Sequence, residues 1–353
     1  SSGVRDEDKD LWPAEYASQQ TEDSLDGFVV SVLLPQLGPM RQMAKLLALD
    51  AKDAAYAGDS QRTLEDIQSM LRIGTHVREH PLLINDLVSL AIYNLTFATI
   101  GEIVEYEPTL FSSKQFESLE QSLNVLEGNF TIRLDGEKYF MLDTLQRMYT
   151  DDGEGDGRII PSEAAKVLAL TDTVALESAD RSLVPAIFAP IADLFYASRK
   201  EMQDQYTERM GFAENRLGVP LFTLRNQPDV WQSHWPKATS TLDPYFLVDL
   251  LMPSLQKAIL QGEYTRGKRD ATVAILYAVQ FHNKTGQWPA DLIDAGVVDA
   301  WSGKPLLIRY SGDEPLIYSV GFDQEDDGGQ FDDSAERWDE RSIGDWVIWP
   351  TAR

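Results

Sequence analysis

The chain has 353 residues, no cysteine, and 57 acidic against 31 basic residues, which gives a formal net charge of −26. The absence of cysteine excludes disulfides, thiolate metal sites and cysteine nucleophiles. The negative charge repels phosphate backbones, so we expect no nucleic-acid partner and expect hard divalent cations as counter-ions.

The first segment, residues 1–35, is polar and mixed, and we predict an extended lead. Its opening, SSGVRDEDKD, is typical of a cut end, which predicts a tag or an N-terminal anchor removed before it. The longest apolar run, residues 82–104, contains Asn85, Asp86 and Glu102. We therefore interpret it as a buried helix and expect no direct membrane insertion of this chain.

Residues 36–242 carry the pattern of a helical domain. Apolar side chains recur at helical spacing in two successive segments, and Pro81 opens a third, long helix to about Val104. The segments contain Met40, Met43, Leu46, Leu47 and Ala51, then Leu64, Ile67, Met70, Leu71 and Ile73. The turn at Gly58-Asp59 resembles that of tetratricopeptide-like hairpins, but no 34-residue repeat is present. We predict a mainly α fold that begins as an irregular antiparallel helical array.

A twelve-residue stretch near the midpoint, DGEGDGRIIPSE at 152–163, follows the D-x-[DN]-x-[DN]-G-x5-E calcium-loop pattern with one departure, at Glu154. Gly157 stands at the turn position, and apolar residues at helical spacing flank the loop. With those flanks, residues 139–170 resemble a single EF-hand. The resemblance implies calcium ligands from the carboxylates of Asp152, Glu154, Asp156 and Glu163 and from the backbone carbonyl of Arg158. The longer Glu154, the lack of a side-chain oxygen at Ile160 and the flexible Gly153 and Gly155 predict a weak site, with Kd on the order of 10⁻⁵ to 10⁻³ M, and no second such loop is found.

Residues 243–353 change in character along their length. A helical pattern runs to about His282, with a break expected near Gly262. The short β-rich runs LIRY, LIYSV and WVIW then alternate with turn residues. We predict one long helix followed by a small α+β domain with an antiparallel sheet.

Residues 271–350 carry four motifs in a recognisable order. A helix ends in GQWP at 286–289, DAWSGKP follows at 299–305, a strand leads into SVGFD at 319–323, and DWVIW closes the run at 345–349. This order resembles the globular domain of the major pseudopilins of type II secretion. The resemblance implies a calcium loop formed by Asp323, the Val320 carbonyl and the Ser319 hydroxyl. Asp326, Asp327, Asp332 and Asp333 compete for the remaining ligand positions, of which we select Asp332 and Asp333.

The charge of that loop also indicates a bound cation, independently of the resemblance. Five Asp and one Glu lie within eleven residues, 323–333, and repel one another unless a hard cation neutralises them. Pseudopilins begin with an apolar helix that polymerises, whereas a long helical domain stands here. We therefore expect the pseudopilin-like domain to serve as a calcium-stabilised part of a periplasmic, cell-envelope or extracellular protein.

A third motif, His76-Val77-Arg78-Glu79-His80, spells the inverted zinc-protease pattern H-x-x-E-H. On one helix the two histidines could share zinc while Glu79 acts as the base. Pro81 follows His80 directly and disfavours helical backbone there, and no downstream acidic ligand is evident.

We therefore predict a non-enzymatic protein, stabilised by calcium, whose helical array holds a protein partner. The alternative is a zinc-dependent hydrolase that uses His76, Glu79 and His80. A third interpretation is a cytosolic helical adaptor without metal.

Overall fold

The computed structural model describes residues 34, 36–164, 196–224, 243–252, 255–311, 314–330 and 344–350. The fold is mainly helical with a small three-stranded antiparallel sheet near the C-terminus, which confirms the predicted fold class. The chain forms two units that interleave along the sequence. The first comprises residues 1–34, 135–212 and 231–253, and the second comprises residues 35–134, 213–230 and 254–353.

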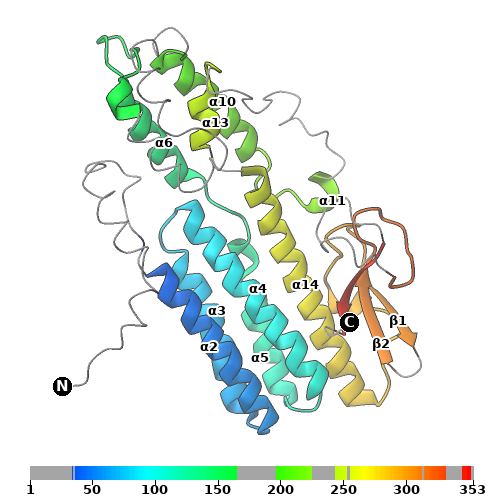
Figure 1. Ribbon diagram of the computed structural model, residues 1–353. Helices are drawn as coiled ribbons and strands as arrows, with labels where there is room; N and C mark the ends of the chain where they lie inside the picture. The colour runs from blue at the N-terminus through cyan, green and yellow to red at the C-terminus, as the bar shows by residue number, and fades with distance from the viewer. Residues whose placement is uncertain are drawn as a thin grey trace, which may run out of the picture. The chain divides into compact units, whose positions relative to one another are not determined.

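The helices described in the second unit include α2 (Leu37–Tyr56), α3 (Ser60–Val77), α4 (Leu83–Tyr106), α5 (Ser113–Asn124) and α14 (Leu255–Thr285), of which the first three follow the segments predicted for residues 40–104. Within this unit α4 packs against α2, α3 and α14, and α5 packs against α3 and α14 (Figure 1). At the first hairpin Gly58 adopts a positive φ of 75°, and the Asp59 side chain caps α3 by accepting from the Arg62 backbone N–H at 3.1 Å.

Helix α4 is the core of this unit. It is long and apolar enough to span a membrane by length and composition, yet 67% of its most apolar window is buried inside the structure. Residues on every side of α4 are buried, which explains why it lacks a polar face.

Helix α2 buries a different face from the one its largest apolar residues suggest. Its contact with the other helices is made by Ala44, Ala48, Ala51 and Ala55, all 5% exposed or less. Met43, Leu46 and Leu49 are instead 54%, 67% and 65% exposed. Small side chains allow close approach of helix backbones, so packing distance, not hydrophobicity alone, selects the buried stripe.

The break expected near Gly262 does not occur, because α14 is continuous from Leu255 to Thr285. Gly262 serves packing instead. A Cβ placed there would lie 2.3 Å from the backbone oxygen of Phe130. The glycine therefore marks a close contact between α14 and another segment of the same unit.

The C-terminal sheet consists of β1 (Leu307–Ser311), β2 (Glu314–Ser319) and β3 (Trp346–Trp349), in the order β1-β2-β3 with antiparallel pairing. In the register Ile308 faces Ile317, and Ile317 faces Trp349. An aromatic chain links this sheet to the end of α14, since Trp288 stacks on His282 at 4.2 Å and meets Trp349 edge-on at 5.6 Å.

Three helices of the first unit are described: α6 (Asp135–Met148), α10 (Arg199–Glu214, within this unit to Phe212) and α13 (Phe246–Leu251). The Tyr206 hydroxyl on α10 donates to the Glu137 carbonyl on α6 at 3.0 Å. An ion pair between Arg209 and Asp249 joins α10 to α13. Short helices η3 (Glu127–Asn129), α11 (Leu221–Leu224) and η5 (Ile293–Ala295) belong to the second unit.

Candidate functional site

The mid-chain acidic loop, residues 152–163, forms a hairpin-like turn after α6. The Thr150 N–H donates to the Arg158 carbonyl at 2.8 Å, and the Asp152 N–H donates to the Asp156 carbonyl at 2.9 Å. Gly157 is required by close approach, since a Cβ there would lie 1.8 Å from the Thr150 backbone oxygen. The carbonyl of Arg158, expected to bind calcium, thus accepts a hydrogen bond inside the turn.

The carboxylates of this loop hold its own backbone. Asp152 Oδ1 accepts from the N–H groups of Glu154 and Asp156, at 2.8 and 3.0 Å. Asp156 Oδ1 accepts from the N–H of Gly157 at 2.8 Å and from that of Lys200, in the first turn of α10, at 3.0 Å. These N–H donors, first that of Lys200, lower the pKa of Asp156.

The remaining predicted ligands of the loop are spread along it. Glu154 is exposed at the tip of the turn, and Glu163 lies in a helical stretch from Pro161 to Ala164. The rest of the predicted exit helix, from residue 165, lies outside the described residues. Asp151, which the sequence pattern did not select, ties the loop to α10 through an ion pair with Arg199 at 3.2 Å.

The C-terminal acidic loop follows β2 and is bonded to both of its flanks. Asp323 Oδ2 accepts from the Gly344 N–H at 2.7 Å, and Asp326 Oδ1 accepts from the Tyr318 hydroxyl at 3.0 Å. Gly321 has a φ of 66°, and a Cβ there would lie 2.4 Å from the Gly344 oxygen. The loop therefore lies tightly against the segment that leads into β3.

Ser319 occupies a structural position in this loop. Its hydroxyl donates to Asp299 Oδ1 at 2.6 Å and accepts from the Gly321 N–H at 3.1 Å. Asp299 is buried and also accepts from Ser302 Oγ at 2.7 Å. The Ser319 side chain, expected among the calcium ligands, thus fastens the DAWSGKP turn to the end of β2.

Two further predicted positions have different outcomes. Val320 is half-buried at the start of the loop, where its carbonyl is expected to bind calcium. Asp332 and Asp333 lie outside the described residues.

The structure adds Asp345, which sequence reasoning missed: it is 1% exposed, and its Oδ2 accepts from the Gly329 N–H at 2.6 Å. Its place as the first residue of DWVIW gave no sign that β3 would bring it under the loop.

Calcium matches the donor chemistry of both loops, because carboxylate and carbonyl oxygens are the ligands it prefers. In the described part of the chain, however, no three His, Asp or Glu side chains converge closely enough to hold a metal ion. Calcium binding would therefore require the carboxylates to turn toward a common centre.

The H-x-x-E-H motif is not placed on a single helix. Helix α3 ends at Val77, and His76 pairs through Nδ1 with Glu79 Oε1 at 2.6 Å. Glu79 and His80 follow in the turn and bend that lead to α4, and both are exposed. The geometry that would let the two histidines share zinc, an i and i+4 pair on one helical face, is absent here.

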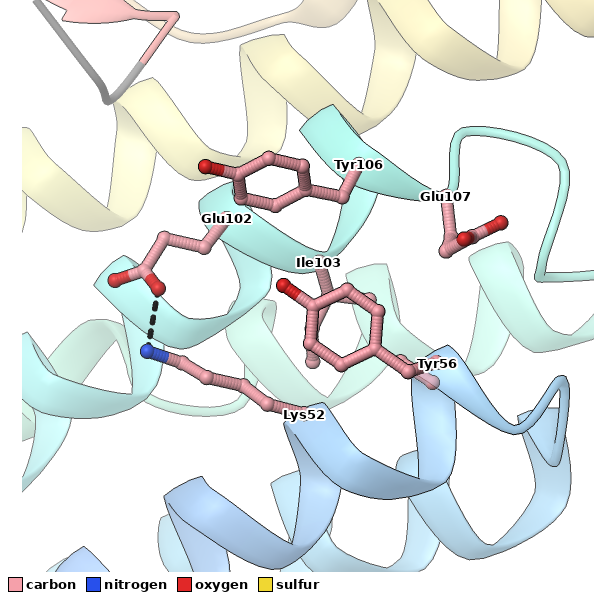
Figure 2. Close-up of a pocket in the computed structure, with 7 residues that line it drawn as sticks. Lys52, Tyr56, Glu102, Ile103, Tyr106 and Glu107 are labelled. Atoms are coloured by element: carbon pink, nitrogen blue, oxygen red, sulfur yellow. Dashed lines mark hydrogen bonds and ion pairs between the residues drawn. The ribbon is translucent and has the colours of Figure 1, made fainter.

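A shallow pocket lies between the C-terminal ends of α2 and α4 (Figure 2). Figure 2 shows the ion pair of Lys52 with Glu102 and the side chains of Tyr56 and Tyr106, whose ring centroids are 6.3 Å apart. The pocket has room for about one water molecule. It can form a polar contact point, but it is too small to enclose a substrate.

No protein-family model, curated protein or solved structure matches this chain. The acidic loops and the exposed surface of the helices are therefore the features of this chain that bear on its function.

Proposed function

We propose that this chain is a non-enzymatic, calcium-stabilised protein of the cell envelope or exterior, whose helical unit holds a protein partner. The observation that carries the proposal is the attachment of the C-terminal acidic loop to β2 through Asp326 and to the segment before β3 through Asp323. A cation that neutralised this loop would relieve repulsion between carboxylates that the sheet holds together. Calcium would then stabilise the domain as a whole.

The exposed side of α2 supports the partner-holding part of the proposal. Met43, Leu46 and Leu49 form an apolar strip at helical spacing on the solvent side of this helix. Tyr56 and Tyr106, at the end of the same helix pair, are 66% and 57% exposed. Exposed apolar side chains that gather on one helix, instead of lying scattered, are typical of protein-binding surfaces.

Adding calcium to chelator-stripped protein should raise the unfolding temperature. At ten times Kd, one site that binds only the folded state contributes about 1.4 kcal/mol to the free energy of unfolding. Differential scanning calorimetry with calcium, with magnesium at the same ionic strength, and with chelator measures this effect. Equal transitions in millimolar calcium and in chelator would rule out the proposed calcium stabilisation.

The contribution of the mid-chain loop is tested separately by Glu163→Gln. This change removes one of the two charged oxygens expected to close the loop around calcium, while the helical stretch at Pro161 is kept. In isothermal titration we expect the variant to lose one binding event and to retain that of the C-terminal loop. Wild-type binding by the variant would show that residues 152–163 do not form a calcium site.

A further inference from the structure

Asp345 is a buried acid that comes from outside the acidic loop. It lies just before β3, is 1% exposed, and its backbone N–H donates to the Gln330 carbonyl at 2.7 Å. Only one of its carboxylate oxygens is satisfied: Oδ2 accepts from the Gly329 N–H, whereas the buried Oδ1 has no hydrogen-bond partner. A buried carboxylate oxygen without a hydrogen-bond partner costs free energy, and a bound ligand would offset that cost.

The surroundings of Asp345 are acidic as well. Burial, and then the negative charges of Asp326, Asp327 and Asp323, raise its pKa to about 6. The hydrogen bond from Gly329 acts in the opposite direction. In the described part of the chain, no Lys, Arg or His forms an ion pair with Asp345. A cation from solution would compensate this carboxylate where the described residues do not.

Asp326 and Asp327 are two of the three loop carboxylates whose charges act on this buried acid. Asp326 already accepts from Tyr318 and from the Gly328 N–H, the latter at 3.0 Å, so its position is fixed. Asp327, the next residue, is exposed at the loop surface. A cation at Oδ1 of Asp345 would take its other oxygen ligands from the loop once the exposed carboxylates there turned toward it.

We propose that Asp345 is a calcium ligand through Oδ1 and that it completes, from the β3 side, the site formed by the C-terminal acidic loop. This inference rests on the proposed function, because it assigns a ligand to the same calcium. Binding would join the start of β3 to residues 323–330 through the metal ion. It would also give the buried carboxylate the charge compensation that the described residues do not supply.

The substitution Asp345→Asn tests the assignment because it is nearly isosteric. The amide oxygen can still accept from the Gly329 N–H, while the amide nitrogen can donate to the carboxylates around it. In chelator we therefore expect the variant to unfold at the same temperature as wild type or at a higher one. In calcium we expect it to lose most of the rise that wild type shows.

Affinity provides a second measurement that does not depend on stability. Terbium can replace calcium, and excitation of Trp346, next to Asp345, should sensitise its luminescence. Displacement of terbium by calcium measures the Kd for calcium. We expect the Kd of Asp345→Asn to be about tenfold to a hundredfold weaker than that of wild type, on the order of the losses seen when metal-site residues are removed. The control Asp294→Asn makes the same charge change at an exposed residue of η5 and should leave Kd unchanged.

The outcomes separate this inference from the proposed function. If wild type shows neither a calcium-induced shift nor calcium-competed terbium binding, the calcium proposal itself fails. If wild type responds and Asp345→Asn responds equally, calcium binds at the loop and the assignment of Asp345 is wrong. Loss of the response in Asp345→Asn but not in Asp294→Asn supports it.

Discussion

Replacing Asp86 with alanine should lower the free energy of unfolding of the second unit by about 3–5 kcal/mol, the cost of removing one partner of a buried ion pair. Asp86 is fully buried at the start of α4. It accepts from the Arg133 backbone N–H at 2.7 Å and from the Arg133 guanidinium at 2.6 Å, and Arg78 lies 3.7 Å away. The carboxylate therefore joins the end of α3, the start of α4 and the segment before α6.

The loss should be large because Arg78 is itself 8% exposed. Burial lowers the pKa of Arg78 and the charge of Asp86 opposes that shift, so alanine would leave a buried guanidinium without its counter-charge. Urea denaturation measures this loss in the free energy of unfolding. The slope of the free energy against urea concentration is compared between the variants.

Glu102→Ala is the matched control in the same helix. Its carboxylate pairs with Lys52, but both side chains are about one-third exposed, at 37% and 31%. Solvent screening limits such a pair to about 0–1 kcal/mol. Equal losses for Asp86→Ala and Glu102→Ala would contradict the role of Asp86 as the buried junction of this unit.

Gly262→Ala should destabilise the second unit, although alanine favours helices over glycine by about 0.5–1 kcal/mol. The new methyl group would lie 2.3 Å from the backbone oxygen of Phe130. A backbone atom cannot move aside as the end of a flexible side chain can, so α14 must shift. We expect the free energy of unfolding to fall by about 1–3 kcal/mol. The urea midpoint of the variant measures this loss.

Gly128→Ala, in η3 of the same unit, makes the same change where no atom apart from those of its chain neighbours lies within 4 Å of the added methyl group. Here we expect no loss of stability and at most a small gain. Opposite signs for the two substitutions would show that packing, not helix propensity, determines the requirement for glycine at residue 262. A stabilised Gly262→Ala variant would disprove the close contact.

Local pattern was enough to predict the helices and strands of the second unit. The period of apolar residues in residues 40–73 and 82–104 identified α2, α3 and α4, and three short β-rich runs identified the sheet. Helices and strands can be predicted in this way because side chains on one face recur with the period of the backbone structure, which the spacing of apolar residues in the sequence reveals. Acidic loops could be found in the same way, since their carboxylates are close in sequence.

Which side chains are buried, and which distant residues are in contact, depends on packing between segments that are far apart in the sequence. The sequence by itself determined a mainly helical, strongly acidic chain with two acidic loops. Only the tertiary structure showed that alanines form the buried face of α2, that Gly262 sits against Phe130, and that Asp86 meets Arg133. It likewise placed Asp345, an ordinary Asp before a strand in the sequence, inside the protein beneath the C-terminal acidic loop with one carboxylate oxygen unsatisfied.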